Sequence, residues 1–354
     1  MTGQPIKVFI VDDSAVLREF LTRILSTEGA FEVIGAAGSG EEALTALETL
    51  EPDLITMDIS LPGVNGLETT RLIMETRPVP IVIITGDHRA QDVMDSFNLM
   101  EIGALAVLEK PPAVNHPDYA AHVRSMVETL KMVAEIRVVK RQSKPLPSPS
   151  RLRRAEVPVG PAIVAIGAST GGPGVIKTIL SGLPTSFPWP VLIVQHMTEG
   201  FLPGFVEWLN LSSSLPVQLA VDGEKMQPGQ VYMAPDGHHL RTCGNGSLSV
   251  ASDPPVNNQR PAVSTLLAAV TRVYGRNAIG ILLSGMGSDG ACELLQMREA
   301  GALTVAQDEA SCIVYGMPGA AVALQGARYT LSPERIAALL TELAHRCSST
   351  ADHR

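Results

Sequence analysis

The segment from residue 163 to residue 172 presents a serine in a glycine-rich turn. It reads Ile-Val-Ala-Ile-Gly-Ala-Ser169-Thr-Gly-Gly, a short apolar run that ends in glycines on both sides of the serine. The apolar run predicts a buried strand, and the glycines allow a tight turn that leaves the Ser169 hydroxyl open to a substrate, as in serine hydrolases. A strand followed by a Gly-rich turn also cradles phosphates in nucleotide-binding folds. This segment alone therefore leaves both classes open.

A histidine and an aspartate follow two further apolar runs. His196 comes directly after the run 191–194 and one glutamine, and Asp289 lies in a Gly-rich segment after the run 278–283. Because parallel strands of one sheet end at the same edge, we expect both side chains beside Ser169. A serine nucleophile needs a base that takes its proton, and the base needs an acid that fixes its tautomer. We predict Ser169 as nucleophile, His196 as general base and Asp289 as orienting acid.

The tetrahedral intermediate of such a reaction carries an oxyanion, which needs preorganised N–H donors. Two backbone amides are candidates because their residues lie in the turns that hold the serine and the aspartate. These amides belong to Thr170 and Met286.

Two of these roles have alternatives. His238 and His239 follow another expected strand, and either is a possible base, with a role in the substrate cleft expected instead. Asp222, Asp253 and Asp308 are alternatives to Asp289, although none lies in as Gly-rich a loop directly after an apolar run. No group of histidines and cysteines has the spacing of a zinc site, which argues against a metallohydrolase.

These residues belong to the second of two regions in which strands and helices alternate. Apolar runs predict strands at 162–166, 191–194, 230–233, 278–283 and 302–306, with helices such as 174–180 and 264–273 between them. The alternation predicts a doubly wound α/β domain with a mostly parallel sheet, which we place at 159–346, and 347–354 is expected to be a disordered tail. The order serine, histidine, aspartate differs from that of the α/β-hydrolases.

The first region, 5–132, shows the same alternation. Apolar runs predict strands at 6–11, 31–37, 54–57, 81–84 and 105–108, with helices such as 40–50 and 66–76. Five strands that alternate with helices predict a doubly wound parallel sheet, which binds ligands beyond the carboxyl ends of its strands.

Five polar residues fall at these strand ends, namely Asp12, Asp13, Asp58, Thr85 and Lys110. Three carboxylates so close together repel one another unless a cation lies among them, and an oxygen-rich, partly hydrated site suits Mg²⁺. The metal and the lysine would neutralise a phosphoryl group transferred to one carboxylate. The sequence therefore predicts a magnesium-dependent phosphoryl acceptor in the first region.

Composition excludes several classes of protein. The chain of 354 residues is 45% hydrophobic and 18% charged, a globular composition with enough sequence for two cores. Most of the net charge of −9 comes from the first third, which argues against binding of nucleic acid there. The basic residues 137–144 and 151–154 lie in Pro- and Ser-rich sequence, so we predict a linker at 133–158.

The chain carries no signal for membranes or for secretion. No apolar run reaches the length of a membrane span, and the N-terminus lacks the features of a signal peptide, so a cytoplasmic protein without membrane insertion is expected. The four cysteines are scattered, which predicts reduced thiols.

The first region resembles the response-regulator receiver domain. The resemblance rests on the strand-end residues, on Asp58-Ile-Ser-Leu-Pro-Gly-Val-Asn-Gly66 and on the pair Lys110-Pro111. It implies that Asp58 is the phospho-acceptor and a ligand of Mg²⁺ together with Asp12 and Asp13. It also implies that Thr85 and Lys110 contact the phosphoryl oxygens and that a cis peptide precedes Pro111.

Nearly the whole chain resembles the chemotaxis protein-glutamate methylesterase (CheB) family. Five ordered motifs carry this resemblance: Gly-Ala-Ser169-Thr-Gly-Gly, Gln-His196-Met, Val231-Tyr-Met-Ala-Pro, Gly-Met286-Gly-Ser-Asp289-Gly and the run from Gln307 to Pro318. One departure is Arg260-Pro-Ala-Val-Ser264, where the family usually has Arg-Pro-Ser-Val-Asp.

The resemblance implies a regulated carboxyl esterase without a cofactor of its own. The family hydrolyses γ-glutamyl methyl esters on chemoreceptors, releases methanol, and often deamidates receptor glutamines. Its receiver takes phosphate from a chemotaxis histidine kinase and, when unphosphorylated, blocks the active site. The alternative is a response regulator whose second domain binds a nucleotide or a protein partner without hydrolysis, and such a protein would not require His196 or Asp289.

Overall fold

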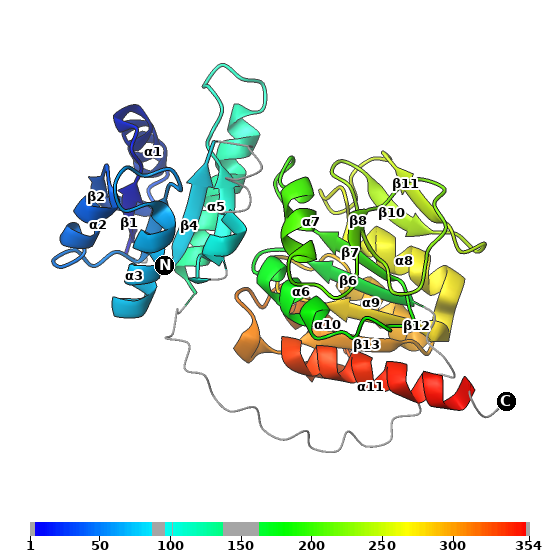
Figure 1. The fold of residues 1–354 in the computed structure, drawn as a ribbon. Coiled ribbons are helices and arrows are strands. Elements are labelled where there is room, and N and C mark those ends of the chain that lie inside the picture. Colours follow the sequence, from blue (N-terminus) through cyan, green and yellow to red (C-terminus); the bar gives the residue numbers. More distant parts are fainter. Residues whose placement is uncertain (1–3, 87–95, 101, 137–162, 352–354) are drawn as a thin grey trace. The chain divides into compact units, whose positions relative to one another are not determined.

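The computed structural model describes residues 4–86, 96–100, 102–136 and 163–351, with side chains as far as residue 347. The chain divides into two compact units, with the division after Pro145. Figure 1 shows each unit as a sheet with helices packed against it, the first in blue to cyan and the second in green to red.

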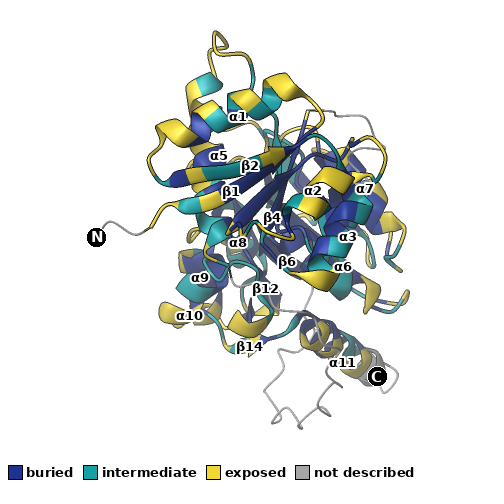
Figure 2. Ribbon diagram, turned by 90° about the vertical axis from the view of Figure 1, so that its left-hand side faces the viewer, coloured by how far each residue is buried: buried dark blue, intermediate teal, exposed yellow. Residues whose placement is uncertain are grey.

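The first unit contains a five-stranded parallel sheet in the order β2-β1-β3-β4-β5. Its strands are β1 (Ile6–Val11), β2 (Phe31–Ala37), β3 (Leu54–Met57), β4 (Ile81–Thr85) and β5 (Ala106–Glu109), and its helices include α1 (Ala15–Thr27), α2 (Gly40–Ala46), α3 (Gly66–Thr76) and α5 (Tyr119–Ala134). The predicted doubly wound sheet is confirmed. Figure 2 shows β4 and most of β1 buried, whereas α1 turns an exposed face to solvent.

Three helices of this unit begin at a polar cap that follows a strand or a turn. The side chains of Ser14, Ser39 and Asn65 each accept a hydrogen bond from a backbone N–H of the first helical turn. Such caps satisfy amides that have no partner inside the helix. Each cap thus fixes the residue at which its helix begins.

The second unit contains a seven-stranded parallel sheet in the order β14-β13-β12-β6-β7-β9-β8. Its strands are β6 (Ile163–Ala168), β7 (Val191–Gln195), β8 (Val217–Leu219), β9 (Val231–Met233), β12 (Ala278–Leu282), β13 (Leu303–Gln307) and β14 (Tyr329–Leu331). A separate antiparallel hairpin joins β10 (His239–Thr242) to β11 (Leu248–Ala251). The mostly parallel α/β domain is thus confirmed.

Helices separate the strands of this unit, except that β8, β9, β10 and β11 follow one another without a helix between them. The helices are α6 (Gly172–Ser181), α7 (Leu202–Asn210), α8 (Val263–Tyr274), α9 (Ala291–Glu299), α10 (Met317–Ala323) and α11 (Pro333–Ala351). The sequence analysis missed β8, β10, β11 and β14, because each has only three or four residues and polar residues interrupt its apolar ones, whereas the equally short β9 is a continuous apolar run.

Strand β6 lies in the middle of the second sheet and packs closely against α8. A Cβ atom at Gly167 would lie 2.2 Å from Cγ1 of Val263, so a larger residue does not fit there. Val263, Leu266, Leu267 and Leu282 belong to the buried core between α8 and the sheet. Close packing at Gly167 therefore sets the distance between the central strand and the start of α8.

Two expected boundaries differ from the helices of the structure. Helix α5 continues to Ala134, so the expected linker at 133–158 begins inside it, and residues 137–158 lie outside the described residues. Helix α11 continues to Ala351, so a disordered tail from Cys347 was wrong for its first five residues. Neither helix meets a proline or glycine near these points, and adding residues to an existing helix is favourable.

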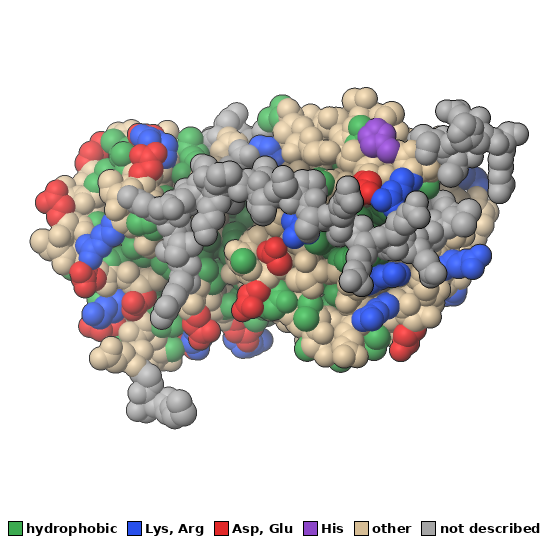
Figure 3. Space-filling view, turned by 90° about the horizontal axis from the view of Figure 1, so that it is seen from below, with side chains coloured by type: hydrophobic (Ala, Val, Ile, Leu, Met, Phe, Trp, Pro, Cys, Tyr) green, Lys and Arg blue, Asp and Glu red, His purple; other side chains and the backbone are tan. Residues whose placement is uncertain are grey.

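Surface and composition agree with two globular units. No helix among the described residues is long and apolar enough to cross a membrane. None of the four cysteines forms a disulfide. On the face drawn in Figure 3, acidic and basic side chains are interspersed.

The core around β12 supports a prediction of stability. Leu282 is completely buried, whereas Leu211 at the end of α7 is 74% exposed. We expect Leu282→Ala to lower the free energy of unfolding of the second unit by about 2 to 5 kcal/mol, because it leaves a cavity. Leu211→Ala is the matched control and should change it by less than about 0.5 kcal/mol.

Tryptophan fluorescence during urea unfolding measures this difference in the second unit. The chain has two tryptophans, Trp189 and Trp208, and both are buried in that unit. Equal losses of stability in the two variants would contradict the assignment of Leu282 to the core.

Candidate active site

Ser169 follows the last residue of β6 and precedes α6 by two residues. Gly171 has φ of 80°, a left-handed conformation that suits glycine, and it closes the turn. The Ser169 N–H donates to the carbonyl of Ser284 at 3.0 Å, and the Ser169 carbonyl accepts from Gly172 N–H at 2.8 Å. The serine is partly buried and lies at the carboxyl edge of the sheet.

His196 lies beside this turn because of the strand register. Ala168 of β6 pairs with Gln195 of β7, and the His196 N–H donates to the Ala168 carbonyl at 2.9 Å. The His196 Nε2 atom lies 3.1 Å from Oδ2 of Asp289, at ion-pair distance. It has no other polar partner among the described residues. Nδ1 is therefore the ring nitrogen available to take a proton from a serine.

Asp289 is 6% exposed and is surrounded by hydrogen-bond donors. Its Oδ2 accepts from Val263 N–H at 2.7 Å, and its Oδ1 accepts from Ser264 N–H and from Asn257 Nδ2, each at 3.1 Å. Burial raises the pKa of the carboxyl, but the hydrogen bonds from His196, Ser264 and Asn257 outweigh it and lower the pKa to about 2. Asp289 is thus a carboxylate at neutral pH, next to the imidazole.

Asn257 and the first residues of α8 hold this carboxylate, and the sequence analysis missed them. Asn257 and Asn258 have φ of 53° and 60° and form the tip of a tight turn between Val256 and Gln259. Left-handed conformations are tolerated by asparagine, so the turn presents the Asn257 amide to Asp289. Asn257 and Asp289 are 32 residues apart, so no local sequence pattern indicates this contact.

Ser264, which stands where the resembled family usually has aspartate, lies next to the Asp289 carboxylate. The contact to Asp289 is made by the backbone N–H of Ser264, and the Ser264 Oγ atom lies 3.4 Å from Asn257 Nδ2. The backbone donor does not depend on the type of residue, whereas the Ser264 side chain also lowers the pKa of Asp289, so serine at this position adds to the support of the carboxylate.

The two candidate oxyanion donors lie in the loops after β6 and β12. The backbone N–H groups of Thr170 and Met286 donate to no other described residue. The Met286 side chain is 43% exposed. Both amides are therefore available to a ligand at the edge where Ser169 lies.

The alternative histidines have other contacts. His239 is completely buried; its Nδ1 accepts from Ala262 N–H at 3.2 Å and its Nε2 lies 3.1 Å from the Pro254 carbonyl. His238 Nδ1 lies 2.7 Å from the carbonyl of Asp236. Both rings contact backbone in the segments around the β10–β11 hairpin rather than Asp289.

The alternative aspartates also support local structure. Asp222 accepts from Val250 N–H, Asp253 pairs with Arg241, and Asp308 caps a short 3₁₀ helix through Ser311 N–H. Among the described aspartates of the second unit, Asp289 is the one whose carboxylate lies at ion-pair distance from a histidine ring.

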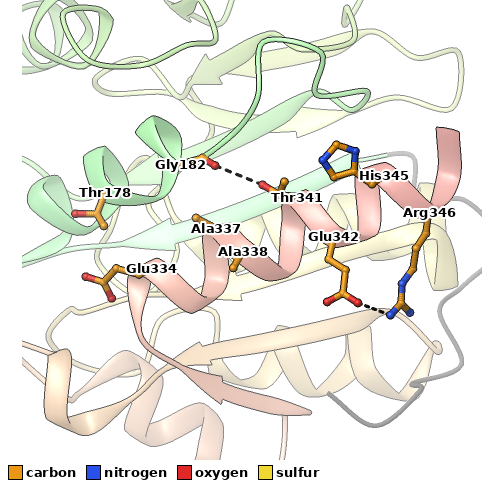
Figure 4. Close-up of a pocket in the computed structure, with 9 residues that line it drawn as sticks. All are labelled: Thr178, Gly182, Glu334, Ala337, Ala338, Thr341, Glu342, His345 and Arg346. Atoms are coloured by element: carbon orange, nitrogen blue, oxygen red, sulfur yellow. Dashed lines mark hydrogen bonds and ion pairs between the residues drawn. The ribbon is translucent and has the colours of Figure 1, made fainter. Parts of the chain in front are cut away.

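A cavity of about 750 Å³ lies between α6 and α11, away from the residues described above. Figure 4 shows its lining, with Thr178 from α6, Gly182 directly after that helix and the other residues from α11. Gly182 is ten residues after Gly172, which corresponds to about 15 Å along the helix axis. This groove is therefore not part of the site at the strand ends.

In the first unit, Lys110 joins two of the predicted carboxylates. Its Nζ lies 2.9 Å from Oδ2 of Asp12 and 2.9 Å from Oδ2 of Asp58. Both aspartates are buried, and Thr85 at the end of β4 is also buried and accepts from Lys110 N–H through its carbonyl. The peptide before Pro111 is not cis, contrary to expectation; the described cis peptide is Arg260–Pro261. Most X-Pro bonds in folded proteins are trans.

The donor set of this unit fits a hard divalent cation. One oxygen from each of Asp12, Asp13 and Asp58 lies within 4.8 Å of the others. Burial raises the pKa of Asp58 despite the hydrogen bond from Lys110, because one lysine is shared between two buried carboxylates. Three carboxylates and one ammonium leave negative charge that a cation with oxygen ligands would balance.

Comparison with known proteins identifies the family of each unit. Residues 164–340 match the family model of the CheB methylesterase, and residues 8–118 match that of the response regulator receiver domain. A protein-glutamate methylesterase/protein-glutamine glutaminase of Geobacter metallireducens is 49% identical over 96% of this chain and 99% of its own length. One of Nitrosospira multiformis with the same name is 48% identical over 96% of this chain and 97% of its own.

A solved structure shows the same likeness in the second unit. The crystal structure of the Thermotoga maritima CheB methylesterase catalytic domain is 37% identical, with a TM-score of 0.51, and it covers 52% of this chain and 100% of that one. A unit with a serine, a histidine and an aspartate at one sheet edge thus follows, in the sequence, a receiver unit with an acidic site of its own. The chain belongs to the CheB methylesterase family.

Proposed function

We propose that this protein hydrolyses glutamyl methyl esters on chemoreceptors, releases methanol, and deamidates receptor glutamines, under control of phosphorylation. One observation carries the esterase: the parallel register of β6 and β7, with the loop after β12, brings Ser169, His196 and Asp289 to one edge of the sheet. The names of relatives that match nearly the full chain supply the substrates. Esters and glutamine amides share an acyl group, so one site serves both.

The reaction follows from the roles of these three residues. Ser169 Oγ attacks the ester carbonyl while His196 takes the serine proton, and the imidazolium is stabilised by the Asp289 carboxylate. His196 then returns the proton to the leaving methoxide, and methanol departs. Water attacks the acyl-serine with the same histidine as base, which releases the glutamate and regenerates the serine. The amides of Thr170 and Met286 donate to the oxyanion in both steps.

The receiver controls this activity through Asp58. Asp58 accepts the phosphoryl group from a chemotaxis histidine kinase, Asp12 and Asp13 hold Mg²⁺ together with it, and Thr85 and Lys110 contact the phosphoryl oxygens. A bound Mg²⁺ supplies positive charge that offsets the developing phosphoryl charge. The Lys110 ammonium lies 2.9 Å from Asp58 and is therefore close enough to contact an oxygen of the attached phosphoryl group. Phosphorylation adds about −1.5 to −2 charges to this edge and relieves inhibition by the unphosphorylated receiver.

The protein acts in the cytoplasm, where chemoreceptors present their methylated helices. A second domain that only binds a nucleotide or a partner is disfavoured, because a buried carboxylate paired with a histidine is not needed to cradle phosphate. The variants below separate these possibilities.

The first prediction concerns the nucleophile. Ser169→Ala should reduce methanol release from radiolabelled, methylated receptor membranes by roughly 10³-fold or more, because no acyl-serine forms. His196→Ala should have a similar effect. The matched control, Ser249→Ala in β11, should retain the rate of the unsubstituted chain. Release of methanol that survives Ser169→Ala would exclude the serine mechanism.

The second prediction concerns pH. Because the pKa of Asp289 is lowered to about 2, its carboxyl stays ionised at every pH above about 4, and its contribution to stability is lost only as the pH falls through about 2. The decline of kcat/KM on acidification above pH 4 should therefore report the uptake of a single proton, at a group other than Asp289. Asp289→Asn should lower kcat by roughly 10²- to 10⁴-fold. A decline that requires two protons above pH 4 would contradict the assignment.

The third prediction concerns regulation. With Mg²⁺ and a small phosphodonor such as acetyl phosphate, the full chain should release methanol faster, whereas Asp58→Asn should keep the basal rate without stimulation. Asp53→Asn, at an exposed aspartate of the same unit, is the control and should still be stimulated. Removal of residues 1–140 should raise the rate above that of the unphosphorylated chain; a rate no higher would argue against inhibition by the receiver.

A further inference from the structure

We propose that Gln195 is a positioning residue for ester hydrolysis, which orients the Thr170 amide toward the developing oxyanion. The inference rests on the proposed function, because it concerns the oxyanion of that reaction. It assigns a role to the side chain of the last residue of β7, which directly precedes the candidate base in the sequence.

Gln195 is the last residue of β7 and is 4% exposed. Its Nε2 donates to two carbonyls, that of Ser169 at 2.8 Å and that of His196 at 2.8 Å. Two carbonyl acceptors require the NH₂ group at this place, so the contacts themselves decide the orientation of the amide. One side chain thus connects the turn of the nucleophile with the backbone of the base.

The hydrogen bond to the Ser169 carbonyl decides where the next amide points. The Ser169–Thr170 peptide unit is planar, and in a trans unit the C=O and the N–H point in opposite directions. The Ser169 carbonyl accepts from Gln195 Nε2 and also from Gly172 N–H at 2.8 Å. With its oxygen held by two donors, this unit cannot rotate without breaking both bonds, so the Thr170 N–H keeps a single direction.

The peptide units on either side are held as well. Ser169 N–H donates to the Ser284 carbonyl at 3.0 Å, and Ser284 Oγ donates to the Thr170 carbonyl at 2.7 Å. Three consecutive units of the turn therefore have partners outside it. A donor that needs no reorientation during the reaction is the property that makes an oxyanion hole effective.

The second candidate donor shows the same arrangement. The Met286 N–H belongs to the unit whose carbonyl is that of Gly285, and this oxygen accepts from Gly316 N–H at 3.1 Å and from Met317 N–H at 2.8 Å. In both units, a carbonyl with two donors lies opposite an N–H without a protein partner among the described residues. In the Met286 unit both donors are backbone groups, whereas in the Thr170 unit one is the side chain of Gln195.

Stability alone does not account for a glutamine at this position. The Oε1 atom of Gln195 is buried and has no hydrogen-bond partner among the described residues, which costs free energy. A Cβ atom at Gly172 would lie 2.2 Å from Oε1, so the start of α6 must be glycine for the glutamine to fit. A methionine would fill similar space without an unsatisfied oxygen, and the amide is therefore explained by what its Nε2 holds.

The test is Gln195→Met in the full chain, with 4-nitrophenyl acetate as substrate. We expect kcat to fall roughly 10- to 100-fold with KM changed by less than about threefold, because the loss affects the transition state rather than substrate binding. Inhibition by propylboronic acid, whose tetrahedral adduct places an oxygen near the oxyanion position, should weaken by a similar factor. A merely structural role would lower the unfolding temperature and leave this inhibition unchanged.

The matched control is Gln230→Met. Gln230 Nε2 also donates to two carbonyls, those of Pro216 and Val231, but at the start of β9 and away from the site. It should keep kcat within about threefold. Gln195→Glu, which keeps the shape and loses the donors, is the second variant; it should lose kcat in the same way if Gln195→Met does not fold.

Ser169→Ala separates failure of this inference from failure of the proposed function. If Ser169→Ala still hydrolyses the ester, the serine mechanism is wrong and the inference fails with it. If Ser169→Ala is inactive while Gln195→Met matches Gln230→Met in kcat and in boronate inhibition, only the positioning role is overturned.

Discussion

The parallel pairing of β6 with β7 and β12 is the constraint on which the second unit depends. Gly167 pairs with Leu282 on one side and Ala168 with Gln195 on the other, so the residues that follow these strands meet at one edge. The strand order changes direction beside β6, which is where doubly wound sheets bind their ligands. All residues of these three strands are buried, so a slip of one residue would turn their side chains to the opposite face of the sheet and disrupt the packing on both faces.

Burial of carboxylates at such an edge is tolerated only where donors replace water. Asp289 has two backbone N–H donors, the Asn257 amide and the His196 ring, and its pKa is lowered. Asp58 shares one lysine with Asp12, and burial raises its pKa. The difference in donors suits the different chemistry: one carboxylate stays charged beside an imidazole, and the other lies where added cationic charge would be favourable.

Hydrogen bonds also hold the backbone carbonyls around Ser169 in place. Peptide units next to Ser169 have their oxygens held by Gln195, Ser284 and Gly172, and the Thr170 N–H has no partner among the described residues. Dipoles held in this way do not need to reorganise when charge develops, which in the proposed hydrolysis would lower the barrier. The unsatisfied oxygen of Gln195 is a small loss of stability at a functional site, as observed in many enzymes.

The sequence by itself determined the two α/β units and most of their strands, because apolar runs and Gly-rich turns are local signals, and its ordered motifs determined the family. It also predicted Ser169, His196 and Asp289 as site residues, because each follows an apolar run. Only the tertiary structure decided which His196 nitrogen faces Asp289, that Asn257 holds this carboxylate, and that Gln195 holds the Ser169 carbonyl. The short strands β8 and β14 also emerged only there. These contacts join residues 26 to 93 positions apart, as with Gln195 and Ser169 at 26, and local periodicity has no information about partners so distant in sequence.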